Sequence, residues 1–462
     1  MPNKHLIKEF EKQVGRQNIM AEEADRQAYA YDSAVLDAVV PALVIRPTTT
    51  EQLGQTVRLC HQHGLPLTVR GSGTNLSGGT IPSSAESVVI VTNALADIIE
   101  INAEDMYGVV QPGVITANFA AAAAEKNLFY PPDPGSQTVS TIGGNVAENA
   151  GGLRGLKYGV TKDYVMGIEF FDAAGELVKS GSRTVKCATG FNLTDLMVGS
   201  EGLLGVYSQI TLKLIPPPKA QQAMMAVFDS VDKASETVSA IIASQIIPCT
   251  LEFLDNFTIR TVEDFRQAGL PVDAEALLLI EVDGHPAAVE DDAAQIKELC
   301  TRQGATKIQM AQSAAEKDLI WQARRDALPA LARLKPTTVL EDATVPRSKI
   351  PEMVKRINEI GKKYNITIGT FGHAGDGNLH PTILTDKRNH EEFSRVEKAI
   401  DEIFETALSF GGTLSGEHGI GLAKSKYLEN ETSRGTILYS RRLKKALDPK
   451  NILNPGKMIG EG

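Results

Sequence analysis

The sequence predicts an α+β protein with more than one domain, on three observations. Its 462 residues are enough for two or three domains with separate hydrophobic cores. Short apolar runs alternate with helical patterns through residues 41–220 and again through 221–410. The run Pro216–Pro218 lies between these stretches and indicates a boundary, because regular structure tends to end before proline. We expect a helical segment over 1–40, domains over 41–220 and 221–410, and a C-terminal segment over 411–462.

Composition and charge limit the classes of protein to which the chain can belong. Charged residues make up 23% and hydrophobic residues 42%, which is typical of a globular protein in solution. The net charge is −10 and no basic cluster stands out, so nucleic acid is not an expected partner. No apolar run approaches the roughly 18–20 residues that span a bilayer. We expect a cytoplasmic protein that reaches a membrane only through a partner.

The four cysteines exclude two further classes. They are widely separated, at Cys60, Cys187, Cys249 and Cys300, and no Cys-x-x-Cys motif occurs. Neither a disulfide framework nor an iron–sulfur cluster within this chain is therefore expected.

The first domain is predicted from its apolar runs and caps. Residues 43–45 and 65–69 read as strands, and Thr48 and Glu51 form a capping-box signal for the helix between them, which ends near His63. Strands over 88–91 and 107–110 and an alanine-rich helix over about 115–126 follow.

The second domain shows strands at 224–228 and 277–282, each before a helical pattern, which suggests an antiparallel sheet. Near its end, strands over 366–371 and 381–384 flank a glycine-rich turn. The C-terminal segment is glycine-rich at first and then helical.

Two histidines flank that turn and could share a metal ion. If the strands pair, His373 and His380 face each other with Cβ atoms roughly 4.5–5.5 Å apart. Glu417 and His418 lie side by side in a second glycine-rich loop. Two histidines with one carboxylate are a recurring catalytic metal site. We propose His373, His380 and Glu417 as metal ligands and His418 as the neighbouring base.

The competing interpretation is that these histidines are ordinary polar residues, as we expect for His61 and His63. Those two end a helical pattern before Gly64, where histidine suits the helix C-terminus and glycine the cap.

Three glycine-rich loops could cradle a phosphate, because successive backbone N–H groups in such turns bind anions. They span residues 70–79, 131–152 and 199–205. The first lacks the third glycine of a Rossmann fingerprint, and no Walker motif is present. The loops could be simple turns, but three of them among predicted strands favour a large dinucleotide in a less common fold.

These motifs together resemble a known family. The Arg70–Thr74 loop, the Pro131–Ser136 run, the Gly143–Asn145 turn and Gly199–Gly202 are similar to the FAD-binding domain of the vanillyl-alcohol oxidase superfamily. The two histidine motifs resemble the branch that holds D-lactate dehydrogenase, the FAD subunit of glycolate oxidase and D-2-hydroxyglutarate dehydrogenase. The resemblance implies a two-subdomain FAD-binding domain, an α+β substrate (cap) domain with an antiparallel sheet, and a C-terminal helical segment.

The resemblance also implies which residues bind the cofactor. No histidine lies between His63 and His285, so FAD is expected to be bound non-covalently. The expected FAD-binding residues are Arg70, Gly71, Ser72, Gly73, Thr74, Asn75, Ser77, Gly78, Pro134, Gly135, Ser136, Ser140, Thr141, Gly143, Gly144, Asn145, Gly152, Glu201, Gly202, Gly205 and Asn454.

For the reaction, the resemblance implies oxidation of a small D-2-hydroxy acid, D-lactate or glycolate, to the 2-keto acid. Arg324 is expected to bind the substrate carboxylate, and its neighbour Arg325 is the weaker candidate. The divalent ion would be zinc, manganese or iron. Leu340 stands near the place where the glutarate-specific branch has a lysine, which disfavours a dicarboxylate substrate. Electrons would pass to an external acceptor protein, an iron–sulfur subunit or an electron-transferring flavoprotein.

Two alternative functions remain at this stage. The chain could be a metal-free FAD subunit of a larger oxidase complex, without substrate chemistry of its own. It could also be a non-redox metallohydrolase that uses the same ligands but has no use for the glycine loops.

Overall fold

The computed structural model describes residues 4–460, which group by their contacts into two units. Unit 1 comprises residues up to 151, 160–217 and 417 onward, and unit 2 comprises 152–159 and 218–416. The chain therefore passes between the units four times. One passage falls inside the Pro216–Pro218 run. The four-part division expected from the sequence stays a prediction.

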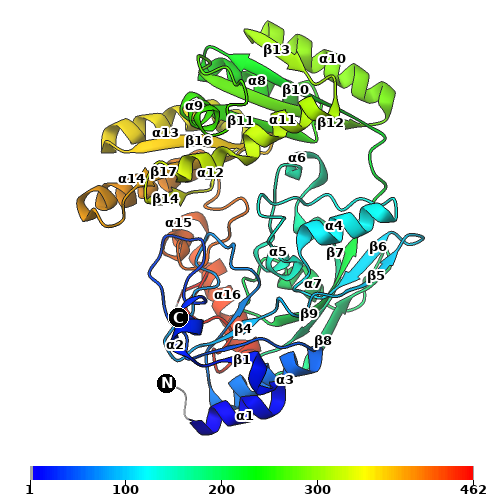
Figure 1. Ribbon diagram of the computed structural model, residues 1–462, viewed down its shortest axis with the longest axis vertical. Coiled ribbons are helices and arrows are strands. Elements are labelled where there is room, and N and C mark those ends of the chain that lie inside the picture. The colour runs from blue at the N-terminus through cyan, green and yellow to red at the C-terminus, as the bar shows by residue number, and fades with distance from the viewer. Residues whose placement is uncertain (1–3, 461–462) are drawn as a thin grey trace. The chain divides into compact units, whose positions relative to one another are not determined.

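In its described residues, unit 1 contains two sheets (Figure 1). The first has the order β1-β2-β4-β3, in which β2, β4 and β3 are parallel and β1 is antiparallel. The second has the order β5-β6-β9-β7-β8 and is antiparallel throughout. The strands are β1 (Ile19–Met20), β2 (Leu43–Ile45), β3 (Leu67–Arg70), β4 (Val88–Val91), β5 (Ile98–Asn102), β6 (Tyr107–Val110), β7 (Val165–Phe171), β8 (Leu177–Gly181) and β9 (Val206–Lys213).

Helices cover both sheets of unit 1 and bury one core against each. Side chains of α1 and α3 pack on the first sheet around Phe10 and Leu53, and α4 and α5 pack on the second around Phe119 and Val146. The helices are α1 (Lys4–Val14), α2 (Glu23–Gln27), α3 (Thr50–His63), α4 (Thr116–Glu125), α5 (Ile142–Glu148), α7 (Leu193–Met197), α15 (Leu428–Glu431) and α16 (Arg434–Leu447).

Helix α3 begins one residue later than its predicted capping box. Thr49, not Thr48, is the N-cap, and its side chain accepts a hydrogen bond from the Gln52 amide. The Gln52 side chain accepts in turn from the Thr48 amide at 2.9 Å, so Gln52 takes the part assigned to Glu51. The error arises because three threonines in a row offer equivalent caps. At the other end Gly64 adopts a left-handed conformation, as expected after His61 and His63.

Unit 2 is built on one eight-stranded antiparallel sheet, which confirms the predicted α+β class and the antiparallel sheet of the second stretch. Its order is β13-β10-β12-β11-β16-β17-β14, and β15 also pairs with β17. The strands are β10 (Ala220–Phe228), β11 (Thr250–Asp255), β12 (Ala276–Gly284), β13 (Lys307–Met310), β14 (Thr337–Leu340), β15 (Ala343–Thr344), β16 (Thr367–His373) and β17 (Asn378–Thr385).

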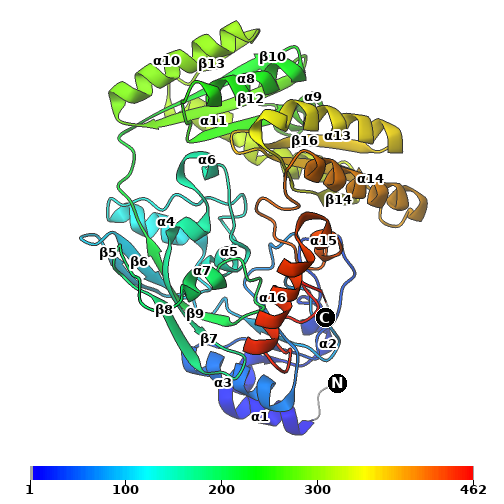
Figure 2. The same ribbon diagram turned by 180° about the vertical axis from the view of Figure 1, so that it is seen from behind.

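Two sets of helices cover this sheet. Residues of α9, α11 and α12 form a core with one face, around Trp321 and Phe371. In the other set, α13 and α14 run side by side (Figure 2) and α8 contacts both α10 and α13. The helices are α6 (Gly155–Tyr158), α8 (Val231–Ala243), α9 (Asn256–Arg266), α10 (Pro286–Arg302), α11 (Ala314–Arg325), α12 (Ala327–Ala332), α13 (Ile350–Tyr364) and α14 (His390–Ser409).

The short helix α6 belongs to unit 2 although its sequence neighbours belong to unit 1. Its Lys157 ammonium lies 2.6 Å from the buried carboxylate of Asp283 at the end of β12, and its Tyr158 hydroxyl donates to the same carboxylate at 2.7 Å. Asp283 therefore fastens residues 152–159 to the sheet of unit 2.

Candidate functional site

The hairpin of β16 and β17 carries the two predicted metal-binding histidines, but in a different register from the predicted one. His373 lies opposite Asn378, and His380 lies opposite Phe371. The prediction that the histidines face each other directly is wrong, because β17 begins at Asn378 and not after His380. The turn is thus shorter than the sequence suggested. Since Phe371 and His373 are two residues apart, they share one face of the sheet with His380.

The histidine rings nevertheless lie close together in this diagonal arrangement. Their centroids are 5.1 Å apart with perpendicular planes, and one nitrogen of each ring lies within 4.8 Å of the other. Nδ1 of His373 is 2.7 Å from a carboxylate oxygen of Glu252, and Nδ1 of His380 makes a longer contact of 3.4 Å with the Glu341 carbonyl. Metal-ligating histidines usually donate their other ring N–H in this way. The pair therefore fits a divalent ion as two of its ligands.

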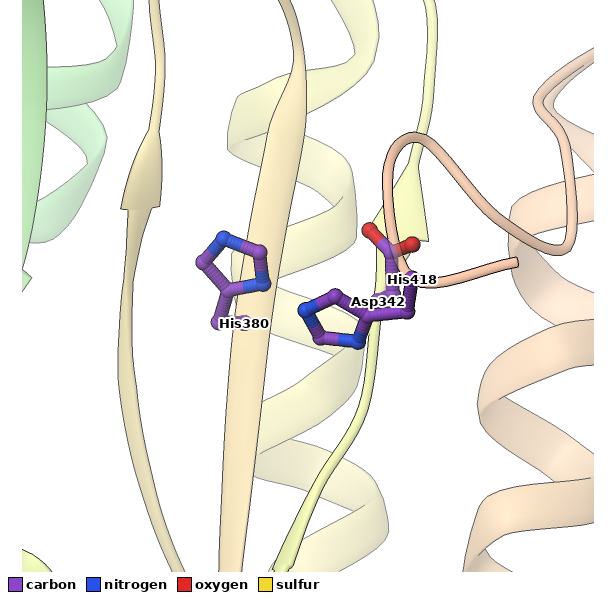
Figure 3. Close-up of side chains that lie close together, drawn as sticks. All are labelled: Asp342, His380 and His418. Atoms are coloured by element: carbon purple, nitrogen blue, oxygen red, sulfur yellow. The ribbon is translucent and has the colours of Figure 1, made fainter. Parts of the chain in front are cut away.

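Asp342 lies near His380 because the strand that pairs with β17 is interrupted at that point. β14 ends at Leu340 and β15 starts at Ala343, so the break lies beside His380 and Pro381. Pro381 sits inside β17, not at its first residue as predicted, and a proline without an N–H suits such a break. Figure 3 shows the His380 imidazole and the Asp342 carboxylate, and one ligand atom of each lies within 4.8 Å of the other.

Arg324 is the predicted substrate-binding residue, and the structure places it beside the same hairpin. Its Nε donates to a carboxylate oxygen of Glu252, and its guanidinium carbon lies 4.6 Å from the centre of the Phe371 ring. Burial raises the pKa of Glu252, but the charges of His373 and Arg324 outweigh it and hold that pKa below the ordinary value. The carboxylate is therefore ionised at neutral pH. Arg325, the weaker candidate, is exposed.

In unit 1 the first glycine loop turns around the side chain of Asn75. Its Oδ1 accepts hydrogen bonds from the amides of Ser77 and Gly79, at 3.0 and 2.7 Å. A Cβ at Gly71 would lie 2.2 Å from Oγ1 of Thr141, so the first and second loops meet where only glycine fits. The structure thus brings these two predicted FAD-binding loops together.

Polar side chains shape the second loop from within. The Thr116 hydroxyl lies 3.0 Å from the Ser140 hydroxyl and accepts from the Asn145 amide at 2.7 Å. Thr141 caps α5 by accepting from the Gly144 amide. Gly152, another predicted FAD-binding residue, is grouped instead with unit 2.

The loop that carries His418 is fastened to the third glycine loop. Glu201, with a positive φ of 49°, accepts from the amides of Ile420 and Gly421, both at 2.7 Å. A Cβ at Gly419 would lie 2.2 Å from the Glu148 carboxyl and 3.0 Å from that of Glu201. His418 is thus one residue from the point where two carboxyl groups meet the loop.

Glu417 lies at the start of the same loop. A Cβ at Gly151 would come within 2.7 Å of its carboxylate, so the glycine run of the second loop lies against this predicted ligand within unit 1. Gly416, the preceding residue, is the last of unit 2, and a Cβ there would lie 2.5 Å from Oγ1 of Thr344 and 2.6 Å from Nδ2 of Asn378.

Asn454 ties the loops of unit 1 together. Its Nδ2 donates to the carbonyls of Gly79 and Glu201, at 3.0 and 2.7 Å, and its Oδ1 accepts from Thr68 and Lys457. These four bonds use the full capacity of an asparagine side chain. Lys457 is fully buried, and burial lowers its pKa to about 7. The negative charges of Asp32, Glu201 and Glu148 raise this pKa but do not offset the effect of burial.

Two buried polar atoms test whether unit 1 fits a large polar cofactor. Nδ2 of Asn75 and Oε2 of Glu148 have no hydrogen-bond partner among the described residues. Buried polar atoms are nearly always paired, so such atoms beside glycine loops fit a bound ligand. Burial, and then the neighbouring Glu201, raises the pKa of Glu148 well above the ordinary value. A neutral carboxyl can donate a hydrogen bond to such a ligand.

The sequence interpretation missed four residues that lie beside the predicted site residues: Glu148, Glu252, Asp342 and Lys457. Glu148 lies inside the second glycine-rich loop and Lys457 directly follows Gly456, and a charged residue beside such glycines was an available signal. Glu252 lies between the apolar residues Leu251 and Phe253 of a buried strand, where an acid signals a paired or functional carboxylate. Nothing in the local sequence connects it with His373.

The glycine loops, the buried polar atoms and the α+β architecture fit an FAD-dependent oxidoreductase, and comparison with known proteins agrees. The FAD binding domain family matches residues 41–181, and the family of FAD linked oxidases, C-terminal domain, matches residues 217–458. The chain belongs to this family of FAD-linked oxidases, in the vanillyl-alcohol oxidase-type superfamily. This membership excludes the metallohydrolase alternative.

Named relatives cover nearly the whole chain. The glycolate oxidase subunit GlcD of Bacillus subtilis is 49% identical over 447 residues, 97% of this chain and 95% of that protein. The D-lactate dehydrogenase of Anaerostipes hadrus is 32% identical over 463 residues, 98% of this chain and 97% of that protein. These are the two activities that the sequence motifs suggested.

Solved structures confirm the predicted fold class. p-Cresol methylhydroxylase superposes with a TM-score of 0.84 at 16% identity, covering 99% of this chain and 96% of that one. Across residues 4–460, no helix combines the length and apolar character needed to cross a bilayer.

We expect FAD to be released by acid, because no histidine occurs among the glycine loops to form a covalent tether. Precipitation of the purified protein with acid should leave yellow flavin in the supernatant, measured by its absorbance. Flavin that stays with the washed pellet would contradict this expectation.

Proposed function

We propose that the protein oxidises a small D-2-hydroxy acid, D-lactate or glycolate, to the 2-keto acid, using FAD and one divalent ion. Electrons then pass to an external acceptor protein, an iron–sulfur subunit or an electron-transferring flavoprotein. The names of the two relatives support the substrate class. The arrangement of Arg324, Glu252, His373 and His380 in unit 2 carries the proposal, because it offers a cation for a carboxylate beside two metal-ligating imidazoles.

Arg324 binds the substrate carboxylate in this proposal. Nε of its guanidinium is occupied by Glu252, and a guanidinium can still offer N–H groups of its fork to a second carboxylate. The Phe371 ring beneath the guanidinium restricts its orientation. The side chain is therefore held before substrate arrives, which reduces the entropy lost on binding.

His373, His380 and Glu417 would hold the divalent ion, which is zinc, manganese or iron in this proposal. The oriented imidazoles and the position of Glu417 immediately after Gly416 support this ligand set. A divalent ion at such a site supplies Lewis acidity, which lowers the pKa of a bound hydroxyl group.

His418 removes the proton from the substrate hydroxyl. Its loop is held through Glu201 against the glycine loops of unit 1, which supports a position beside the flavin. Imidazole suits the step because its ordinary pKa is close to neutral. FAD, when bound, accepts the two electrons of the oxidation.

A substrate panel with an artificial electron acceptor tests this proposal. We expect the purified holoprotein to reduce the dye with D-lactate or glycolate and not with L-lactate or D-2-hydroxyglutarate. Dye reduction by none of a set of short 2-hydroxy acids would contradict the proposal.

A second candidate is a metal-free FAD subunit of a larger oxidase, which the word "subunit" in the name of the Bacillus relative favours. Elemental analysis separates the two functions. A flavin-loaded protein without a divalent ion and without activity on any acid would support this candidate.

Replacing Arg324 with alanine is expected to raise KM for the acid by about 30-fold or more, because a lost charged partner typically costs 2–5 kcal/mol. Turnover should change less, the signature of an interaction present in both ground and transition states. Steady-state kinetics measures both effects. Arg325→Ala, an exposed neighbour on the same helix, is the matched control. Equal KM values for the two variants would remove Arg324 from the site.

A further inference from the structure

We propose that Glu252 is a positioning residue that couples the substrate-binding arginine to the metal-binding hairpin. The inference rests on the proposed function and adds a residue to it. Glu252 lies on β11, is fully buried, and touches Arg324 with one carboxylate oxygen and His373 with the other. A single carboxylate thereby links α11, β11 and β16.

The pairing of strands fixes the place of this carboxylate. β11 pairs with β16 through Phe253 and Gly372, which are the neighbours of Glu252 and His373 in the two strands. Glu252 therefore reaches His373 across adjacent strands without a flexible loop between them. Its position is set by the sheet, as a preorganised site requires.

Each oxygen of Glu252 has a separate chemical consequence. One oxygen lies 2.7 Å from Nδ1 of His373, which orients the ring and leaves Nε2 as the nitrogen available to an ion. The other oxygen accepts from Nε of Arg324 and so fixes the plane of the guanidinium fork. Binding of the acid's carboxylate and binding of the ion thus depend on one shared group.

A second buried carboxylate under α11 provides a matched control. Glu281 on β12 accepts from Trp321 Nε1 and, at 2.8 Å, from Lys317 Nζ. Lys317, Trp321 and Arg324 are spaced by four and three residues and therefore lie on one face of α11. Glu281 and Glu252 both contact this face. Among residues 4–460, the Glu281 carboxylate accepts hydrogen bonds from Lys317 and Trp321, and from neither Arg324 nor His373.

The experiment compares Glu252→Gln with Glu281→Gln in the flavin-loaded full chain. For Glu252→Gln we expect KM for the acid to rise at least 10-fold and the Kd for Mn²⁺ to rise about 10–100-fold, the usual effect of losing a ligand's outer partner. For Glu281→Gln we expect both constants to stay within twofold of wild type, while Tm falls in both variants. Equal effects of the two substitutions on KM and Kd would overturn the inference.

Two further measurements keep the inference testable. If Glu252→Gln does not fold, Glu252→Asp keeps the charge but is too short to reach both partners, and it should raise KM, Kd or both relative to Glu281→Gln. ¹⁵N spectra of the histidine rings in metal-free protein should show Nδ1–H on His373 in the wild type and a changed distribution in Glu252→Gln. An unchanged spectrum would overturn the inference.

The outcomes also separate this inference from the proposed function. A wild-type protein that binds no Mn²⁺ and oxidises no 2-hydroxy acid would contradict the proposed function alone. The ring spectrum of His373 would then still decide whether Glu252 positions it.

Discussion

Replacing His418 with alanine is expected to lower turnover by about 10²–10⁴-fold, the usual contribution of a general base. The hydroxyl proton of a 2-hydroxy acid is only weakly acidic, and without the imidazole it has no acceptor of suitable pKa in the proposed mechanism. KM should change less, because the carboxylate contact through Arg324 remains. Stopped-flow reduction of the flavin by substrate measures the step directly.

The matched control for this prediction is His390→Ala, which removes an exposed histidine at the start of α14. The visible spectrum must show that FAD remains bound in both variants, since the loop of His418 is held against the glycine loops through Glu201. Wild-type turnover in His418→Ala would exclude His418 as the base.

Replacing His380 with alanine is expected to remove the divalent ion and with it most of the activity. A lost ligand should weaken binding by more than the 10–100-fold caused by losing an outer partner of a ligand. Alanine also leaves the neighbouring ring of His373, 5.1 Å away, as the last imidazole of the pair. Elemental analysis of protein passed through a chelating resin measures the ion directly.

His390→Ala serves again as the control, because its histidine lies outside the hairpin. Equal metal content in His380→Ala and wild type would contradict the ligand assignment. Metal loss with unchanged activity would instead show that the ion has no part in the reaction.

The sequence predicted those features that depend on local chemistry. The α3 helix with its Gly64 cap and the antiparallel hairpin that carries the two histidines follow from residues near one another in the chain. The glycine loops were also recognisable, because glycine is required where Gly71 meets Thr141.

The rest depends on pairing between distant segments, which local patterns do not encode. The register that sets His380 opposite Phe371 is fixed by the short turn and by the break opposite Pro381. The contact between Glu252 and His373 joins residues that are 121 positions apart. An acid between the apolar residues Leu251 and Phe253 could not reveal this partner before the strand order was known.

The pairing of helix α6 with Asp283 limits where the genes of two relatives can be recombined. The buried carboxylate of Asp283 has Lys157 and Tyr158 as partners, and these arrive from a segment that the long stretch 218–416 does not contain. If that stretch alone were exchanged between two relatives, Asp283 would come from one protein and its partners Lys157 and Tyr158 from the other. Crossovers that preserve the pairing must carry residues 152–159 along with it. Unit 2 is therefore encoded by two separate segments of the gene.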